Sequence, residues 1–166
     1  MPFTSFLKST VMACAGSATL LAVLALAGAS SANDSMVIPI AAVWWTIAAF
    51  TGVLIGRRTD ASTAIARLLS EAPTAPSLPE VQPARMLFNR LWPLLLATVG
   101  AGACVLVAPQ IPAMAAGFPI IWSLAWRKQE KAVQAIEERD GVRFLLDKTK
   151  AWKPIQLVRT PWFRSG

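Results

Sequence analysis

The sequence predicts an all-α membrane protein, in which four transmembrane helices form two helical hairpins and a small cytoplasmic tail follows them. Three observations support this fold class. The 166 residues have a mean hydropathy of +0.51 and 15% charged residues, against about 25% in soluble domains. Uncharged apolar runs reach the length of about 20 residues that crosses a bilayer. All 16 lysines and arginines lie outside those runs.

The first two spans are residues 11–29 and 37–56, which contain no Asp, Glu, Lys or Arg. Their lengths of 19 and 20 residues fall within the range of about 17–25 that a transmembrane helix needs. The connection, residues 30–36, is too short to hold a domain and contains one charged residue, Asp34. These two spans therefore predict the first helical hairpin.

Residues 1–32 have a second interpretation as a cleaved secretory signal, because they combine Lys8, an apolar run and the small residues 30–32. The apolar core of a signal peptide has about 7–15 residues, fewer than the 19 found here. Another span also follows at once. We therefore expect a retained anchor, preceded by a short N-terminal segment, residues 1–10.

The second hairpin lies in residues 91–126, which are long enough for two spans and contain no Asp, Glu, Lys or Arg. Pro109 and Pro112 divide this block, since proline lacks a backbone donor and disfavours helix at the preceding residue. The predicted spans are 91–108 and 111–126. Because the last one has only 16 residues, a re-entrant hairpin that enters and leaves on the same side is the alternative.

The basic residues predict the orientation of these hairpins. Lysines and arginines occur in residues 1–10, 57–90 and 127–166, and neither connection between paired spans contains one. The positive-inside rule places such segments in the cytoplasm. We therefore expect a multi-pass protein of the cell membrane with both termini cytoplasmic.

The cytoplasmic loop, residues 57–90, has two predicted parts. Asp60 is a suitable N-cap for a short interfacial helix that reaches Ala72 and carries Ile65, Leu68 and Leu69 on one side. Four prolines follow, and this spacing is typical of an extended linker rather than of a docking peptide. They are Pro73, Pro76, Pro79 and Pro83.

Small residues within the spans indicate where helices pack closely. One turn apart on a helix, such residues let two backbones approach, which is a main source of helix association in lipid. The predicted packing residues are Gly52, Gly56, Gly100, Gly102, Ala113 and Gly117. This packing serves the chain itself or a homo-oligomer. Trp44 and Trp45 lie deeper than an interfacial belt, so at least one is expected to face another helix, a lipid or a cofactor.

The tail, residues 127–166, is expected to extend the last helix and then to form two short strands. Asp140-Gly141 ends the helix, and 142–146 and 155–158 are the strands. A lone hairpin is only marginally stable in water. Something must therefore cover it: the membrane surface, the proline-bearing loop or a partner protein.

The tail carries ten basic and five acidic residues, a balance that predicts binding to anionic lipid headgroups. The acidic residues Glu137, Glu138, Asp140 and Asp147 are expected to form a solvated, salt-bridged face. Scattered aromatic residues and the lack of a known module give no support to nucleic-acid binding. The residues expected at the membrane surface are Arg127, Lys128, Lys131, Lys148, Lys150 and Lys153.

The composition argues against most catalytic and transport chemistry. The chain has no histidine or tyrosine, and no catalytic or nucleotide-binding motif occurs. An ion-coupled transporter normally holds an ionisable residue inside the membrane, and these spans hold no acidic or basic one. The few hydroxyls in the spans can bond to their own helix carbonyls. We expect no catalytic site, no metal and no cofactor.

The function that remains is a non-enzymatic one. We expect an accessory or scaffold subunit of a membrane complex, which packs through small residues and presents its tail to a protein partner or to anionic lipid. The alternative is a pore or holin-like permeation protein for small uncharged solutes.

Overall fold

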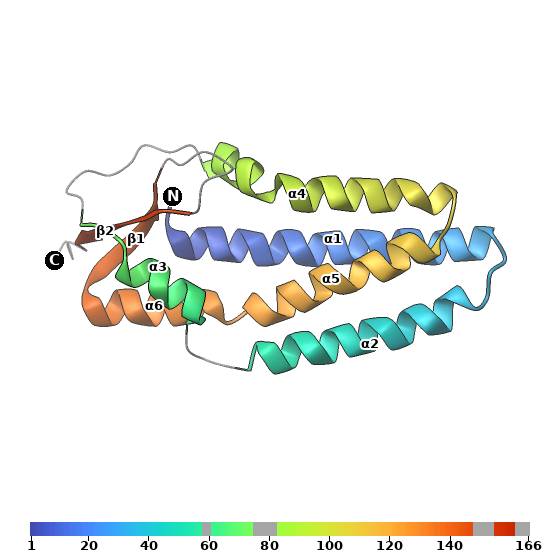
Figure 1. Cartoon of the computed structure of the whole chain (residues 1–166), viewed down its shortest axis with the longest axis horizontal. Coiled ribbons are helices and arrows are strands. Elements are labelled where there is room, and N and C mark those ends of the chain that lie inside the picture. The colour runs from blue at the N-terminus through green and yellow to red at the C-terminus, as the bar shows by residue number, and fades with distance from the viewer. Residues whose placement is uncertain (58–60, 75–82, 148–154, 162–166) are drawn as a thin grey trace. The chain divides into compact units, whose positions relative to one another are not determined.

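The structure is a computed structural model that describes residues 1–57, 61–74, 83–147 and 155–161. It is mostly helical, with a two-stranded sheet near the C-terminus (Figure 1). The elements are α1 (Phe3–Ser31), α2 (Val37–Ile55), α3 (Thr63–Ser70), α4 (Pro83–Ala103), the 3₁₀ helix η1 (Cys104–Leu106), α5 (Gln110–Trp126), α6 (Gln129–Asp140), β1 (Val142–Leu146) and β2 (Leu157–Pro161).

The chain divides into two compact units. The helical unit comprises Thr10–Arg57 and Leu91–Arg127. The composite unit comprises three segments that are far apart in sequence, Met1–Ser9, Arg58–Arg90 and Lys128–Gly166. Helices α1 and α4 each contribute residues to both units.

Three helical stretches in the described residues are long and apolar enough to cross a membrane, which indicates a membrane protein. They are Phe3–Ser31, Val37–Ile55 and Ala84–Leu106. The fourth predicted span corresponds to α5, which has 17 residues and is not among the three.

Two helices begin earlier than the sequence predicted. Helix α1 starts at Phe3 rather than at residue 11, and α4 starts at Pro83 rather than at residue 91. The sequence bounds were set where charged residues begin, but lysine and arginine are good helix formers and continue a helix beyond the apolar run. Charge therefore marks where the apolar run stops and not where the helix stops.

The end of α1 has a local explanation in Asn33. Its φ of 52° is left-handed, a conformation that asparagine tolerates better than most residues. With Asn33 in this state, the Asp34 N–H donates to the Ala29 carbonyl at 3.1 Å and the Asn33 N–H donates to the Ser30 carbonyl at 3.3 Å. These bonds close the helix in a Schellman-type cap and reverse the chain before α2.

The break between the third and fourth predicted spans is confirmed near Pro109, but Pro112 takes no part in it. Helix α4 ends at Ala103, η1 follows, and α5 starts at Gln110 with Pro109 as its N-cap. Pro112 lies in the first turn of α5, where its missing N–H would have no helical partner in any case.

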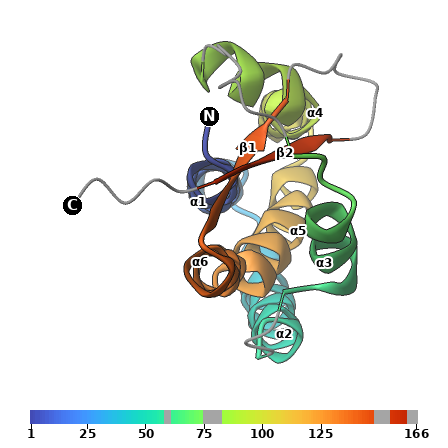
Figure 2. The same ribbon diagram turned by 90° about the vertical axis from the view of Figure 1, so that its left-hand side faces the viewer.

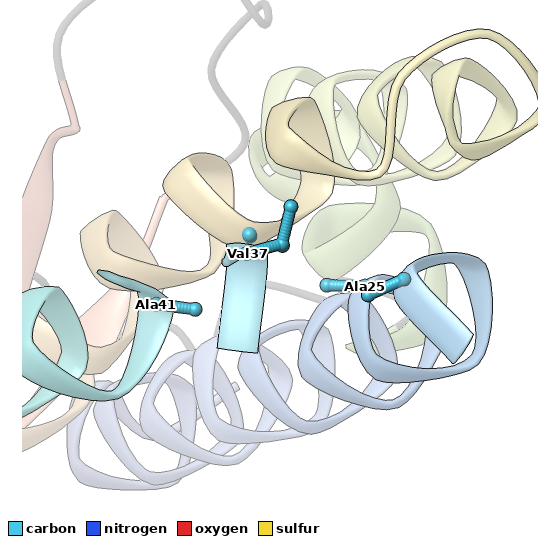
Figure 3. Packing of buried hydrophobic residues seen from close by; sticks show 5 residues of the cluster. Ala25, Val37 and Ala41 are labelled. Carbon is cyan, nitrogen blue, oxygen red and sulfur yellow. The ribbon is translucent and has the colours of Figure 1, made fainter. Parts of the chain in front are cut away.

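The most extensive helix contact in the described residues joins α2 to α5 (Figure 1). The two helices run parallel, because Trp45 in the middle of α2 contacts Ala113 near the start of α5, and Gly56 just after α2 lies against Leu124 near the end of α5. Helices α2 and α5 belong to different predicted hairpins. The short connections within each hairpin therefore did not predict which two helices make the most extensive contact. Buried Ala25 and Ala29 of α1 complete a core with Val37, Ala41 and Ala113 (Figure 3).

In the composite unit, α6 ends where the sequence predicted, since Gly141 adopts a left-handed φ of 63° and its N–H donates to the Glu137 carbonyl. The predicted hairpin is also confirmed as an antiparallel pair of β1 and β2, with Phe144 opposite Arg159 (Figure 2). The second strand is Leu157–Pro161 and not 155–158.

The loop helix is shorter than expected. Helix α3 covers Thr63–Ser70, and its N-cap is Ser62, whose hydroxyl accepts the Ile65 N–H at 3.4 Å. Of the three leucine and isoleucine residues predicted to share one side, Ile65 and Leu69 are buried and Leu68 is partly buried. Asp60, the expected cap, and the linker prolines Pro76 and Pro79 lie outside the described residues.

Candidate functional site

Gly52 and Gly56 form the close contact between α2 and α5. A Cβ added to Gly52 would meet the Ile121 carbonyl oxygen and the Leu124 Cβ at 2.9 Å each. A Cβ added to Gly56 would collide with the Leu124 carbonyl oxygen. The backbones can therefore approach only because both positions lack a side chain.

Gly117 makes room for an indole ring on the same interface. A Cβ at this position would overlap the ring of Trp44. The same ring packs edge-on against Phe118, with the ring centroids 6.2 Å apart. The missing side chain of Gly117 thus lets a large residue of α2 lie directly on the α5 backbone.

The ring N–H groups of Trp44 and Trp45 both form hydrogen bonds from α2 to α5. Trp45 Nε1 donates to the Ala113 carbonyl at 2.8 Å, and Trp44 Nε1 donates to the Met114 carbonyl at 3.0 Å. The sequence analysis expected at least one of them to face another helix, a lipid or a cofactor, and both face another helix. Two bonds to consecutive carbonyls fix the position of α2 along α5.

Two other predicted packing glycines have smaller roles. Gly102 is buried, and a Cβ there would approach Leu24 of α1 at 3.1 Å. Gly100 lies on an exposed face, where an added Cβ would meet nothing within 4 Å. The structure therefore gives Gly100 no part in helix packing. Gly28, which the sequence analysis did not select, would meet Val105 and Pro109 instead.

Four hydroxyl groups in the predicted spans bond to their own helices, as expected. Thr19, Thr46 and Thr98 each donate to the carbonyl four residues earlier, and Ser123 donates to the Ile120 carbonyl. These bonds satisfy the hydroxyls locally.

The composite unit explains what covers the hairpin. On the outer side of β1, the Leu146 N–H donates to the Met1 carbonyl at 3.0 Å, and Pro2 forms a β-bridge with Leu145. Phe3, the next residue, is only 2% exposed. The N-terminal segment therefore lies along the edge of the two-stranded sheet, held there by an isolated bridge and one backbone hydrogen bond. The sequence carried no signal for this pairing, because two residues have no periodicity.

The outer side of β2 is covered in a similar way. The Arg159 N–H donates to the Pro73 carbonyl at 2.9 Å, and Thr74 forms a parallel bridge with Arg159. The proline-bearing loop was one of the three covers that the sequence analysis considered. A third link joins the loop to the tail, because the Ser62 N–H donates to Gln129 Oε1 at 2.9 Å.

Glu137 departs from the expected solvated acidic face. It lies one turn after Val133 on the buried side of α6, and its Oε1 accepts the Phe144 N–H at 2.9 Å. Burial raises the pKa of Glu137, while the bond to Phe144 and the charge of Arg143 act in the opposite direction. The series Gln129, Val133 and Glu137, with its four-residue spacing, is the sequence signal that could have identified this buried carboxylate.

Asp140 fits the expected salt-bridged face. It pairs with Arg139 at 2.9 Å and with Arg159 of β2 at 3.9 Å. The hydrogen bond from Arg139 lowers the pKa of the Asp140 carboxyl. The α6 carboxylates Glu137 and Asp140 therefore hold one strand each of the hairpin.

The predicted membrane-surface residues divide into two groups. Arg127 and Lys131 are exposed and Lys128 is partly buried. Lys148, Lys150 and Lys153 lie outside the described residues. The described residues contain no group of three His, Cys, Asp or Glu side chains that could hold a metal ion.

Comparison of the chain with protein-family models, curated proteins and solved structures gave no match.

Proposed function

We propose that the protein is a non-enzymatic accessory or scaffold subunit of a membrane complex, with four spans and a composite unit in the cytoplasm. The observation that carries this proposal is the contact between three segments distant in sequence, which meet at Met1 with Leu146, at Ser62 with Gln129 and at Pro73 with Arg159. These contacts support a topology in which the N-terminus, the loop and the tail share one side of the membrane. The positive-inside rule assigns these same segments to the cytoplasm.

A full fourth span is supported by the way α5 packs. At 1.5 Å per residue, its 17 residues extend about 26 Å, close to the hydrocarbon thickness of about 30 Å. Contacts with α2 run from Ala113 near its start to Ala125 near its end. A re-entrant helix enters the membrane only part of the way, so it would not contact the spanning helix α2 over its whole length. We therefore favour two complete hairpins over the re-entrant alternative.

The side-chain packing in the helical unit favours a scaffold role over a pore role. One buried cluster of the helical unit consists of four alanines and Val37, and four span hydroxyls are bound to their own helices. A pathway for a polar solute needs such groups turned toward a lumen. We therefore keep the scaffold as the leading function.

Exposed basic residues on the proposed cytoplasmic surface can bind a negatively charged partner. Lys8, Arg85, Arg127 and Lys131 are exposed, and each lies within a few residues of an apolar span. Basic residues at this level attract anionic headgroups, with about 1 kcal/mol for each one near the surface. The basic tail stays a proposed lipid-binding segment, and because its hairpin is bridged by Pro2 and Thr74, its binding is to be tested in the full chain.

Purification of the full chain in a mild detergent tests the proposal. We expect integral-membrane behaviour, with retention in the pellet after alkaline carbonate extraction, and a stoichiometric protein partner after affinity purification. A pure homo-oligomer that releases small neutral solutes from liposomes would contradict the scaffold role and support the pore.

A further inference from the structure

We propose that the end of the helical unit opposite the cytoplasm binds the headgroup of a phospholipid that carries a primary ammonium group. This inference rests on the proposed membrane-spanning function. Its site is a cavity of about 190 Å³ between the starts of α2 and α5. The walls are apolar, with Val37, Ile40 and Met114 among them, and the polar groups at the cavity are Asp34 and Gln110.

The Asp34 carboxylate is held at this cavity by two elements. Gln110 Nε2, from the first residue of α5, donates to Asp34 Oδ2 at 2.9 Å. The Asp34 backbone is fixed at both ends, because its N–H donates to the Ala29 carbonyl and its carbonyl accepts the Val37 N–H at 3.4 Å. A carboxylate has two oxygens, so Oδ1 stays available to a ligand.

The charge at this end selects a cation. Asp34 is the single charged residue in 9–56, and 91–126 contains no Asp, Glu, Lys or Arg. A primary ammonium group supplies both positive charge and N–H donors, and a charge-assisted hydrogen bond is stronger than a neutral one. A trimethylated ammonium group supplies the charge without a donor.

The size and setting of the cavity favour a lipid over a soluble amine. Sites that enclose a whole drug-sized ligand usually have about 300–1,000 Å³, so this cavity accommodates only one end of such a molecule. Ile40 is 59% exposed and Met114 is 47% exposed, and further along α2 the side chains of Val43 and Ile47 are also exposed. An acyl chain can follow this apolar face while the headgroup contacts Asp34.

The test uses the full chain reconstituted with equal amounts of phosphatidylethanolamine and phosphatidylcholine that have identical acyl chains. Native mass spectrometry then counts each lipid retained after extraction. We expect an enrichment of the ethanolamine lipid of about fivefold, equivalent to about 1 kcal/mol, the scale of a partly exposed charge pair. Asp34→Asn keeps an acceptor for Gln110 but removes the charge, so the enrichment should fall to about one.

Glu138→Gln is the matched control, because it removes an equal charge from an exposed position on α6. It should keep the enrichment. Equal retention of both lipids by the unaltered chain, or full enrichment in Asp34→Asn, would overturn the inference, and the first of these outcomes needs no variant to fold. Release of the chain by alkaline carbonate would instead overturn the proposed function.

Discussion

At the scale of single residues, Glu137 shows how burial and hydrogen bonding compete for one carboxylate. Its folded pKa is raised, so the folded protein prefers the protonated form. The contribution of Glu137 to stability is therefore fully present below the unfolded pKa of about 4.3 and is lost as the pH rises through the folded pKa.

Glu137→Gln should remove this pH dependence, since a glutamine keeps the oxygen that accepts the Phe144 N–H but cannot ionise. Near neutral pH the variant should match or exceed the unaltered protein in thermal midpoint, measured in mild detergent. Glu137→Ala should cost about 1–3 kcal/mol, because the Phe144 N–H loses its partner. If both variants lose the same stability, the carboxylate is not acting through this bond.

Gly56, the C-cap of α2, and Gly100, inside α4, form a second test, because an added Cβ would collide with a neighbour at the first and meet open space at the second. Gly56→Ala places a Cβ against the Leu124 carbonyl and should destabilise the helical unit by about 1–3 kcal/mol. Gly100→Ala meets open space and should be neutral or stabilising by up to about 1 kcal/mol through helix propensity. Thermal midpoints of the two variants decide the matter, and equal losses would mean that the α2–α5 contact is not close.

At the scale of elements, the N-terminal segment covers one edge of the two-stranded sheet in the composite unit. Pro2 pairs with Leu145, and Phe3 and Leu7 are buried at 2% and 1% exposure. We therefore expect the chain isolated from membranes to retain residues 1–32. Its intact mass measures this directly. A start near Asn33 would mean that the first helix is a cleaved signal and that the sheet edge is left open.

Helix boundaries and helix partners were predicted with different success for physical reasons. Apolar length located the first three spans, and Gly141 located the end of α6, because both signals are local. The pairing of α2 with α5 depends on Gly52, Gly56 and Gly117 fitting against specific neighbours, which no single segment reveals. The link between Met1 and Leu146 is less predictable still, since it joins opposite ends of the chain.

At the scale of the whole molecule, the charge pattern predicted which segments share a side of the membrane, and the contacts of the composite unit support the same grouping. The sequence analysis treated the N-terminus, loop and tail as separate parts, because each one alone lacks a core. Their union supplies the cover that the hairpin needs, through residues 1–2 on one edge and 73–74 on the other.

The central claim is that these three segments lie together on the cytoplasmic side, and single-cysteine labelling in intact cells tests it most directly. Cys14 and Cys104 are first replaced by alanine, and probes are placed at exposed positions. Probes at Asn33 and Gln110 should react with a membrane-impermeant reagent from outside. Probes at Ser5, Thr74 and Lys131 should react only after permeabilisation. Labelling of the Gln110 probe only after permeabilisation would contradict the account. Labelling of the Ser5, Thr74 or Lys131 probe from outside would also contradict it.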